Sequence, residues 1–210
     1  MPAHRLHVYT VNMDTRTTIV ERAFDELSQK GLGRFSLRAV GEAAGLSATA
    51  VYRHFKNKED LLLSVGEEAF AAYQALVTAI PEAPLEKWLA QVARVYAAFA
   101  LDRPGHFDAC FVLRTRFERV YPQDFAAGKS PVISLIAQRI EDAAASKSVK
   151  HEDALELALM MWAQVHGLVM LHRAGRFSLH REAFLRLCER ASKRFGPDAV
   201  SKTMKKAANR

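Results

Sequence analysis

Apolar residues recur every three or four positions along most of the chain, and this spacing predicts helices. The first clear case begins near Thr15, where Ile19, Ala23 and Leu27 would share one buried face. The same period predicts helices over residues 15–31, 36–45, 47–55, 57–78, 85–101, 104–120, 131–146, 152–174 and 179–195. No segment alternates apolar and polar residues over the length of a strand. The pattern therefore predicts an all-α protein of about nine helices.

Breaks in the pattern divide the chain into four regions. Residues 1–14 show no apolar period and are expected to form a flexible N-terminal arm. Residues 15–60 are expected to form a small helical domain, and residues 61–196 a larger helical bundle, with the division inside the long fourth helix. The polar and basic residues 197–210 are expected to form a tail.

Two short helices in the first domain are separated by a tight turn. Ser36 and Ser47 stand where the N-terminal caps of these helices are expected, and Gly45 lies in the turn between them. Val51 and Phe55, four positions apart, would hold the second short helix to the core. This arrangement is typical of a helix-turn-helix, whose second helix enters the major groove of DNA.

The free side of the second short helix is then expected to face DNA. Ala48 and Thr49 are small, which suits close approach and contact with the thymine methyl group. Arg38 and Arg53 are the candidates for bidentate contact with guanine. Side chains at the far end would contact phosphate, which sets register but not sequence. The predicted DNA contacts are Ser36, Arg38, Ser47, Ala48, Thr49, Tyr52, Arg53, His54 and Lys58.

Charge and composition agree with a nucleic-acid partner. The 210 residues carry a formal net charge of +7, and residues 1–58 hold nine Lys or Arg against five acidic residues. Such a balance favours a polyanion, with solvated surface charge as the alternative. The two separated cysteines favour a reducing compartment. The N-terminus has no apolar run of signal-peptide length, so we expect a cytoplasmic protein with no membrane partner.

The run FSLRAVGEAAGLSATAVYRHFKNKEDLL, residues 35–62, resembles the DNA-binding domain of the TetR-type (tetracycline-repressor-like) regulators. Matching features are the turn at 44–47, the apolar-Tyr-x-His-Phe run at 51–55 and the Lys-x-x-Leu-Leu run at 58–62. The resemblance implies DNA contacts at Arg38, Thr49, Tyr52, His54 and Lys58.

Two residues depart from the pattern of that family. Gly41 stands where the family usually has alanine, which predicts a helix loosened by up to ~1 kcal/mol. Thr49 stands where glycine or proline is common, so the operator need not match that of any relative.

A second motif, MWAQVHGLVMLHRAGRF at residues 161–177, resembles the Trp-x-x-x-His-Gly signature of one TetR-type C-terminal subfamily. Its helix is apolar nearly all round and therefore needs cover on two sides. We expect the bundle core to cover one side and a second copy of the chain the other. The predicted dimer interface consists of Met161, Val165, Leu168, Phe184 and Cys188.

The resemblance also implies a small-molecule effector, of unknown identity, among the C-terminal helices. The candidate pocket residues are Trp88, Phe99, Phe107, Phe111, Arg114, Trp162 and His166. Core packing is the alternative for the aromatic residues, and a hydrogen-bonded core position is the alternative for His166. A solvated position is the alternative for Arg114.

Enzyme function is not expected, because the chain has no His-Glu-x-x-His, phosphate-loop or Gly-x-Ser-x-Gly motif. The isolated His-Asp pairs at 106 and 108 and at 151 and 153 have no third ligand at helical spacing, so neither a metal nor a cofactor is expected. The sequence thus predicts a homodimeric, ligand-responsive transcriptional repressor that binds an inverted-repeat operator. A helical small-molecule-binding or adaptor protein without specific DNA binding, and a sequence-tolerant architectural DNA binder, are the alternatives.

Overall fold

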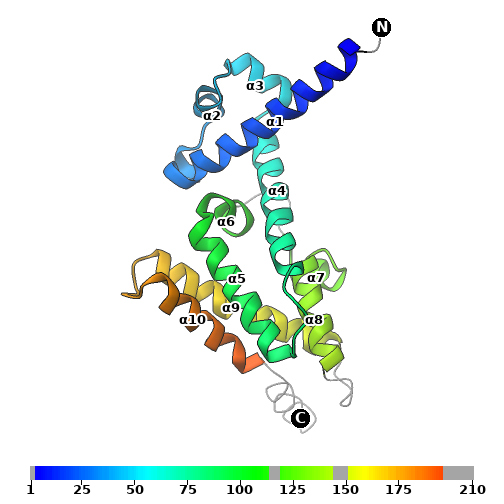
Figure 1. Ribbon diagram of the computed structural model, residues 1–210, viewed down its shortest axis with the longest axis vertical. Coiled ribbons are helices and arrows are strands. Elements are labelled where there is room, and N and C mark those ends of the chain that lie inside the picture. The colour runs from blue at the N-terminus through cyan, green and yellow to red at the C-terminus, as the bar shows by residue number, and fades with distance from the viewer. Residues whose placement is uncertain (1–2, 114–118, 144–150, 196–210) are drawn as a thin grey trace. The chain divides into compact units, whose positions relative to one another are not determined.

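The structure is a computed structural model that describes residues 3–113, 119–143 and 151–195. In these residues it contains ten α-helices, two short 3-10 helices and no strand, which confirms the predicted all-α class (Figure 1). The helices are α1 (Ala3–Lys30), η1 (Leu32–Arg34), α2 (Leu37–Ala43), α3 (Ala48–His54), α4 (Lys58–Thr78), α5 (Leu85–Asp102), α6 (Pro104–Phe111), α7 (Gln123–Ala126), α8 (Pro131–Ala143), α9 (His151–Arg173), α10 (Arg181–Ser192) and η2 (Lys193–Phe195). The four-residue helix α7 is the one that the apolar pattern did not predict.

Two helix ends differ from the prediction. Helix α1 begins at Ala3, so residues 3–14, where a flexible arm was expected, are helical. No glycine or proline occurs between Ala3 and Lys30, so nothing in the sequence stops the helix there. Helix α6 ends at Phe111 instead of near residue 120, because the chain turns and buries Leu113. The predicted tail at 197–210 lies outside the described residues.

The chain divides into two compact units. The first comprises Met1–Ala72 and Arg103–Glu118, and the second comprises Tyr73–Asp102 and Arg119–Arg210. The division falls inside α4, between Ala72 and Tyr73, rather than at the expected boundary after residue 60. The first four turns of α4 and all of α6 belong to the first unit because they pack on its core.

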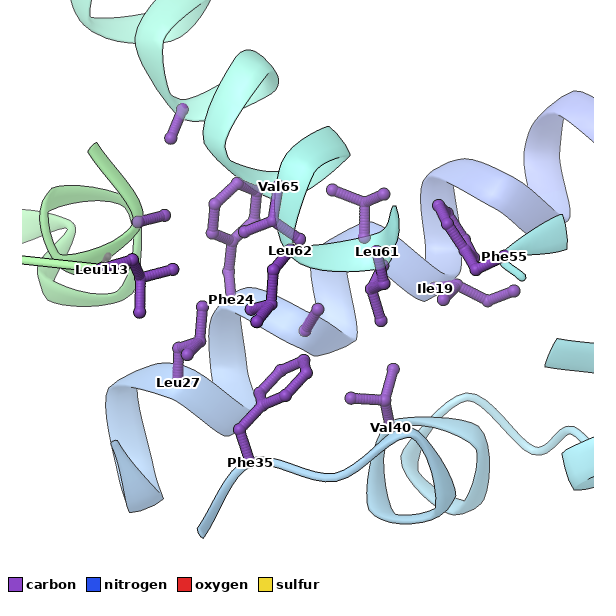
Figure 2. Packing of buried hydrophobic residues seen from close by; sticks show 14 of the residues in the cluster. Ile19, Phe24, Leu27, Phe35, Val40, Phe55, Leu61, Leu62, Val65 and Leu113 are labelled. Carbon is purple, nitrogen blue, oxygen red and sulfur yellow. The ribbon is translucent and has the colours of Figure 1, made fainter. Parts of the chain in front are cut away.

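The core of the first unit gathers apolar residues from α1, α2, α3, α4 and the end of α6 (Figure 2). Its buried members are Ile19, Val20, Ala23, Phe24, Leu27, Phe35, Val40, Val51, Phe55, Leu61, Leu62, Val65, Ala69, Ala109 and Leu113. The predicted apolar face of the first helix is thus confirmed, and α2, α3, α4 and α6 pack against it. Burying a side chain such as Leu27 or Phe55 stabilises the fold by about 1.5–3 kcal/mol.

Gly41 contributes to this packing in a way that its helix propensity does not reveal. The residue is buried, and a Cβ placed on it would come within 2.9 Å of the Val51 Cγ2 atom and 3.3 Å of the Leu46 carbonyl oxygen. Val51 is β-branched and fully buried, so it cannot turn aside easily. Gly41 therefore lets α2 and α3 approach closely, and the expectation that it only loosens α2 is incomplete.

We predict that Gly41→Ala destabilises the protein by about 1 kcal/mol, because the overlap with Val51 outweighs the gain in helix propensity. The free energy of unfolding in urea measures this change. Gly33→Ala is the control, since a Cβ at Gly33 meets no atom within 4 Å. A Gly41→Ala protein that is more stable than the wild type would show that Val51 moves aside without cost.

The second unit is built on α5, α8, α9 and α10. Helix α5 buries one long face that includes Trp88, Leu89 and Tyr96. Ion pairs join α5 to α10: Arg94 donates to Glu182 and to Glu189, each at 2.8 Å. These two carboxylates raise the pKa of Arg94 further above its ordinary value. The pairs fix α10 along α5.

Helix α9 is the most apolar helix of the second unit. An 18-residue window within Asp153–Arg173 has a mean hydropathy of 1.5 and is 39% buried, so by length and composition alone it could cross a membrane. Core helices of soluble proteins pass the same test.

Candidate nucleic-acid interface

The predicted caps of α2 and α3 are present. The Ser36 hydroxyl accepts a hydrogen bond from the Ala39 amide at 3.1 Å, and the Ser47 hydroxyl accepts one from the Ala50 amide at 3.2 Å. Each bond satisfies an amide that has no partner within its helix, and such caps contribute about 1 kcal/mol. Both serines, which were predicted to contact DNA, remain exposed while their hydroxyl oxygens serve as caps.

A tight turn joins the two capped helices. Gly45 has φ of 69°, in the left-handed region that favours glycine. The Leu46 amide donates to the Gly41 carbonyl at 2.8 Å, which closes the turn. The turn thus fixes the direction in which α3 leaves α2 (Figure 1).

Helix α3 has one buried side and one exposed side, as predicted. Val51 and Phe55 are fully buried in the core of the first unit. Tyr52 is 55% exposed although it is a large aromatic residue. The exposed side chains of α3 are Ala48, Thr49, Tyr52 and Arg53. An exposed tyrosine and arginine beside small residues form a surface that can contact both phosphate and base edges.

Arg38, on α2, has an acidic neighbour. Its Nε donates to the Glu42 Oε1 at 2.9 Å, and the two side chains are 86% and 64% exposed. The hydrogen bond to Glu42 raises the pKa of Arg38 above its ordinary value. Water screens an exposed pair of this kind, so the bond holds the guanidinium only weakly. Arg38 can therefore exchange Glu42 for another acceptor.

Lys58 has structural partners that the sequence did not predict. Its ammonium group donates to the Phe35 carbonyl at 2.8 Å and to the Leu32 carbonyl at 3.4 Å, and lies 5.3 Å from the Phe35 ring centroid. These contacts join the start of α4 to the segment that precedes α2. The Lys58 ammonium, which was predicted to contact phosphate, is thus already hydrogen-bonded to two carbonyls of its own chain.

The start of α4 is capped by side chains as well. The Asn57 Oδ1 accepts from the Asp60 amide at 2.8 Å, and the Asp60 Oδ2 accepts from the Lys56 amide at 2.9 Å. The segment between α3 and α4 is therefore held by two side-chain hydrogen bonds, one accepted by Asn57 and one by Asp60. Arg16 of α1 reaches the same junction and was not identified from the sequence, because an apolar period gives no weight to a polar position.

Replacing Tyr52 or Arg53 with alanine is predicted to weaken operator binding by about 1–3 kcal/mol while leaving the fold intact. Both side chains are exposed, so neither supports the core. Titration of a labelled operator with each variant measures the loss, and thermal unfolding checks the fold. Tyr52→Phe separates the hydroxyl from the ring. Unchanged affinity in both alanine variants would contradict the assignment of α3 as the reading helix.

The predicted effector residues do not all lie in one compact unit. Trp88, Phe99, Trp162 and His166 belong to the second unit, and Phe107 and Phe111 to the first. In the first unit, the Phe107 and Phe111 ring centroids are 5.1 Å apart. In the second, Trp88 and Phe99 are each 2% exposed. The seventh residue, Arg114, lies outside the described residues.

Trp162 and His166 meet at a third residue, Tyr96, which was not in the predicted set. The Trp162 Nε1 donates to the Tyr96 hydroxyl at 3.1 Å, and this hydroxyl lies 2.7 Å from the His166 Nδ1. Burial, and more weakly the charge of Arg173, lowers the pKa of His166. His166 is therefore a half-buried, hydrogen-bonded residue that favours its neutral form.

The predicted dimer residues need correction. Met161, Val165, Phe184 and Cys188 are each no more than 2% exposed within the single chain, so their side chains belong to its own core. Leu168 is only half-buried. The exposed side of α9 instead carries Met160, Ala163, Met170 and Leu171, with the half-buried Gly167 between them. The apolar pattern failed here because α9 is apolar on both sides.

The isolated His-Asp pair of α6 is accounted for by packing. The His106 ring stacks on Phe24 with ring centroids 3.5 Å apart. Burial, and the nearby charge of Arg103, lowers the pKa of His106. Within the described residues, no group of three His, Cys, Asp or Glu side chains could hold a metal ion.

Comparison with protein families gives two matches that together span most of the chain. Residues 19–65 match the model described as bacterial regulatory proteins of the tetR family. Residues 89–194 match the model described as the tetracyclin repressor-like C-terminal domain. An uncharacterized HTH-type transcriptional regulator of Haemophilus influenzae is 41% identical over 56 residues, which is 26% of this chain and 27% of that protein.

Solved structures share the fold over nearly the whole chain. A protein of unknown function from Rhodococcus sp. RHA1 has a TM-score of 0.68 and 24% identity, covering 86% of this chain and 93% of that one. A TetR family transcription regulator from Marinobacter aquaeolei VT8 has a TM-score of 0.66 and 20% identity, covering 89% and 97%. A fatty acid degradation regulator from Bacillus halodurans has a TM-score of 0.67 and 14% identity, covering 86% and 94%.

Proposed function

Because the chain belongs to the tetracycline-repressor-like family of transcriptional regulators, we propose that it represses transcription as a homodimer that releases its operator when a small molecule binds. The observation that carries the proposal is the exposed side of α3. Tyr52, Arg53 and small residues are presented to solvent there, on a short helix whose other side is anchored at Val51 and Phe55. A helix-turn-helix presents its second helix to the major groove in this way.

The exposed side of α9 supports the homodimer. Met160 is 51% exposed, Leu171 is 47% exposed and Met170 is 38% exposed, all on one helix. The helix also carries Ala163 and Gly167 on this side, where small side chains permit close approach of another helix. A second copy of the same helix would cover this surface about a two-fold axis. The same contact accounts for the apolar character of α9 without a membrane, in keeping with action in the cytoplasm.

Two-fold symmetry has a consequence for the operator. Each subunit would offer one α3, and the two helices would enter successive major grooves about 34–36 Å apart. The operator would therefore be an inverted repeat. Tyr52 and Arg53 of each subunit would contact equivalent positions in the two half-sites.

The second unit would hold the effector. The partly buried hydrogen-bonded chain from Trp162 through Tyr96 to His166 joins α5 to α9. A ligand that offers a hydrogen-bonding group could compete for these polar atoms. The dimer would have two conformations, one in which the spacing of the two α3 helices matches the operator and one in which it does not. To release the operator, the ligand must bind more tightly to the second conformation than to the first.

Selection of duplexes from a random pool by the wild-type protein tests the proposal. We expect enrichment of one inverted repeat, bound at least ~10³-fold more tightly than unrelated duplex at physiological salt. Enrichment of no sequence, with tight salt-dependent binding to any duplex, would indicate an architectural DNA binder. Absence of DNA binding would indicate a small-molecule-binding or adaptor protein.

A further inference from the structure

We propose that Arg16 sets the orientation of the reading helix α3 and so determines which bases that helix can reach. The proposal rests on the function proposed above, in which α3 reads DNA. Arg16 is a positioning residue in this account, because it acts through α3 and does not itself contact a base.

Helix α3 needs such a residue because it is short. It has seven residues, and Val51 is its only fully buried residue. The next anchor is Phe55, at the C-terminal cap. Residues four apart on a helix lie one above the other along its axis. Because Val51 and Phe55 lie on one such line, they leave α3 free to rotate about that line. This rotation would move Tyr52 and Arg53 across the groove.

Arg16 supplies a contact away from that line. Its guanidinium carbon lies 4.3 Å from the centroid of the Phe55 ring, over the ring face. Its Nη1 donates to the His54 carbonyl at 3.4 Å, a long bond to the last residue of α3. Carbonyls at the end of a helix lack partners within the helix and attract positive charge. The Arg16 guanidinium therefore contacts both the Phe55 ring and the C-terminal end of α3.

The other end of the guanidinium is fixed to α4. The Arg16 Nη2 donates to the Ser64 hydroxyl at 2.7 Å, and that hydroxyl donates to the Asp60 carbonyl at 3.3 Å. The directions agree, since Ser64 gives its proton to Asp60 and accepts from Arg16. Asp60 in turn accepts from the Lys56 amide in the segment between α3 and α4. Arg16 thus ties α1, the end of α3 and the first turns of α4 together.

Arg16 is exposed, so direct contact with a phosphate is the competing role. The two roles predict different binding data. Removing a phosphate contact weakens binding to all duplexes alike and reduces the salt slope by about one unit. A positioning contact changes discrimination between sequences and leaves the salt slope for unrelated duplex unchanged.

The test compares Arg16→Met with the wild type and with Arg22→Met. Methionine keeps an apolar stem of similar reach and removes the charge and the donors. Arg22 lies on the same helix and pairs with Asp25 at 2.8 Å, one turn away on α1. Each protein is titrated, at several salt concentrations, against the duplex that the wild type selects and against one unrelated duplex. Thermal unfolding of each variant is recorded alongside.

We expect Arg16→Met to lower the ratio of the two affinities by about tenfold, the size of one lost base contact, with the affinity for unrelated duplex unchanged. Arg16→Lys should lose most of the same ratio, because an ammonium group cannot hold Ser64 and the α3 carbonyl in one plane. Arg22→Met should keep the wild-type ratio. If Arg16→Met does not fold, Ser64→Ala removes one hydroxyl from the same contact and should lower the ratio in the same direction.

Equal weakening on both duplexes with a reduced salt slope would overturn the inference and make Arg16 a phosphate contact. An unchanged ratio in Arg16→Met, or an equal loss in Arg22→Met, would overturn it as well. A wild type that selects no duplex would instead overturn the proposed function, and the inference with it.

Discussion

An Ala163→Glu chain is expected to fold normally, to sediment as a monomer and to bind the operator at least ~100-fold more weakly than the wild type. Ala163 is exposed in the single chain and glutamate is a good helix former, so the subunit tolerates the change. In the proposed dimer the carboxylate would be buried against the facing α9 without a partner, which is costly. Two linked reading helices bind about 10²–10⁴-fold more tightly than one, and the monomer loses this gain.

Two matched variants show whether the effect belongs to the interface. Ala75→Glu introduces the same side chain at an exposed position of α4 and should leave sedimentation and operator affinity unchanged. Val165→Glu introduces it at a residue that is 2% exposed and should unfold the subunit instead. A dimeric Ala163→Glu protein with wild-type affinity would show that the exposed side of α9 is not the contact.

Gly105→Ala is expected to destabilise the first unit by about 1–3 kcal/mol, a large effect for one methyl group. A Cβ on Gly105 would overlap the carbonyl oxygen of Phe24 in α1 and would lie 3.3 Å from the Ser28 Cβ. Helix backbone cannot move aside as a flexible side chain can, so α6 must shift away from α1. The stack of His106 on Phe24 would be lost with it.

Chemical unfolding of the Gly105→Ala protein measures this cost, and Gly66→Ala is its control. A Cβ on Gly66, in α4, would lie 3.7 Å from the Ala109 carbonyl oxygen of α6, an ordinary contact. Gly66→Ala should therefore be neutral or stabilising by up to ~1 kcal/mol. Equal stability of the two variants would show that α6 does not need close contact with α1.

Local chemistry made much of the first unit predictable. The apolar period located the buried face of α1, and the side-chain caps Ser36 and Ser47 marked the starts of α2 and α3, because both signals act within one or two turns. Gly45 marked the turn because few other residues adopt its backbone conformation. The exposed side of α3 followed from the positions of its two anchors.

Features that depend on the approach of distant segments were not predictable in the same way. The role of Gly41 follows from the proximity of Val51, which no helix propensity contains. Arg16 meets its partners 38 and 48 positions away in the sequence. In α9, apolar residues occupy both sides, so the period could not distinguish the core residue Val165 from the exposed Met160.

Changing the spacing between the two half-sites of the selected duplex tests the central claim most directly. Five added base pairs rotate one half-site by about half a turn of B-DNA, so a dimer with fixed reading helices can engage only one of them. We predict that the affinity falls at least ~100-fold, to that of a duplex with a single half-site. Wild-type affinity for the expanded duplex would contradict paired reading by two copies of α3.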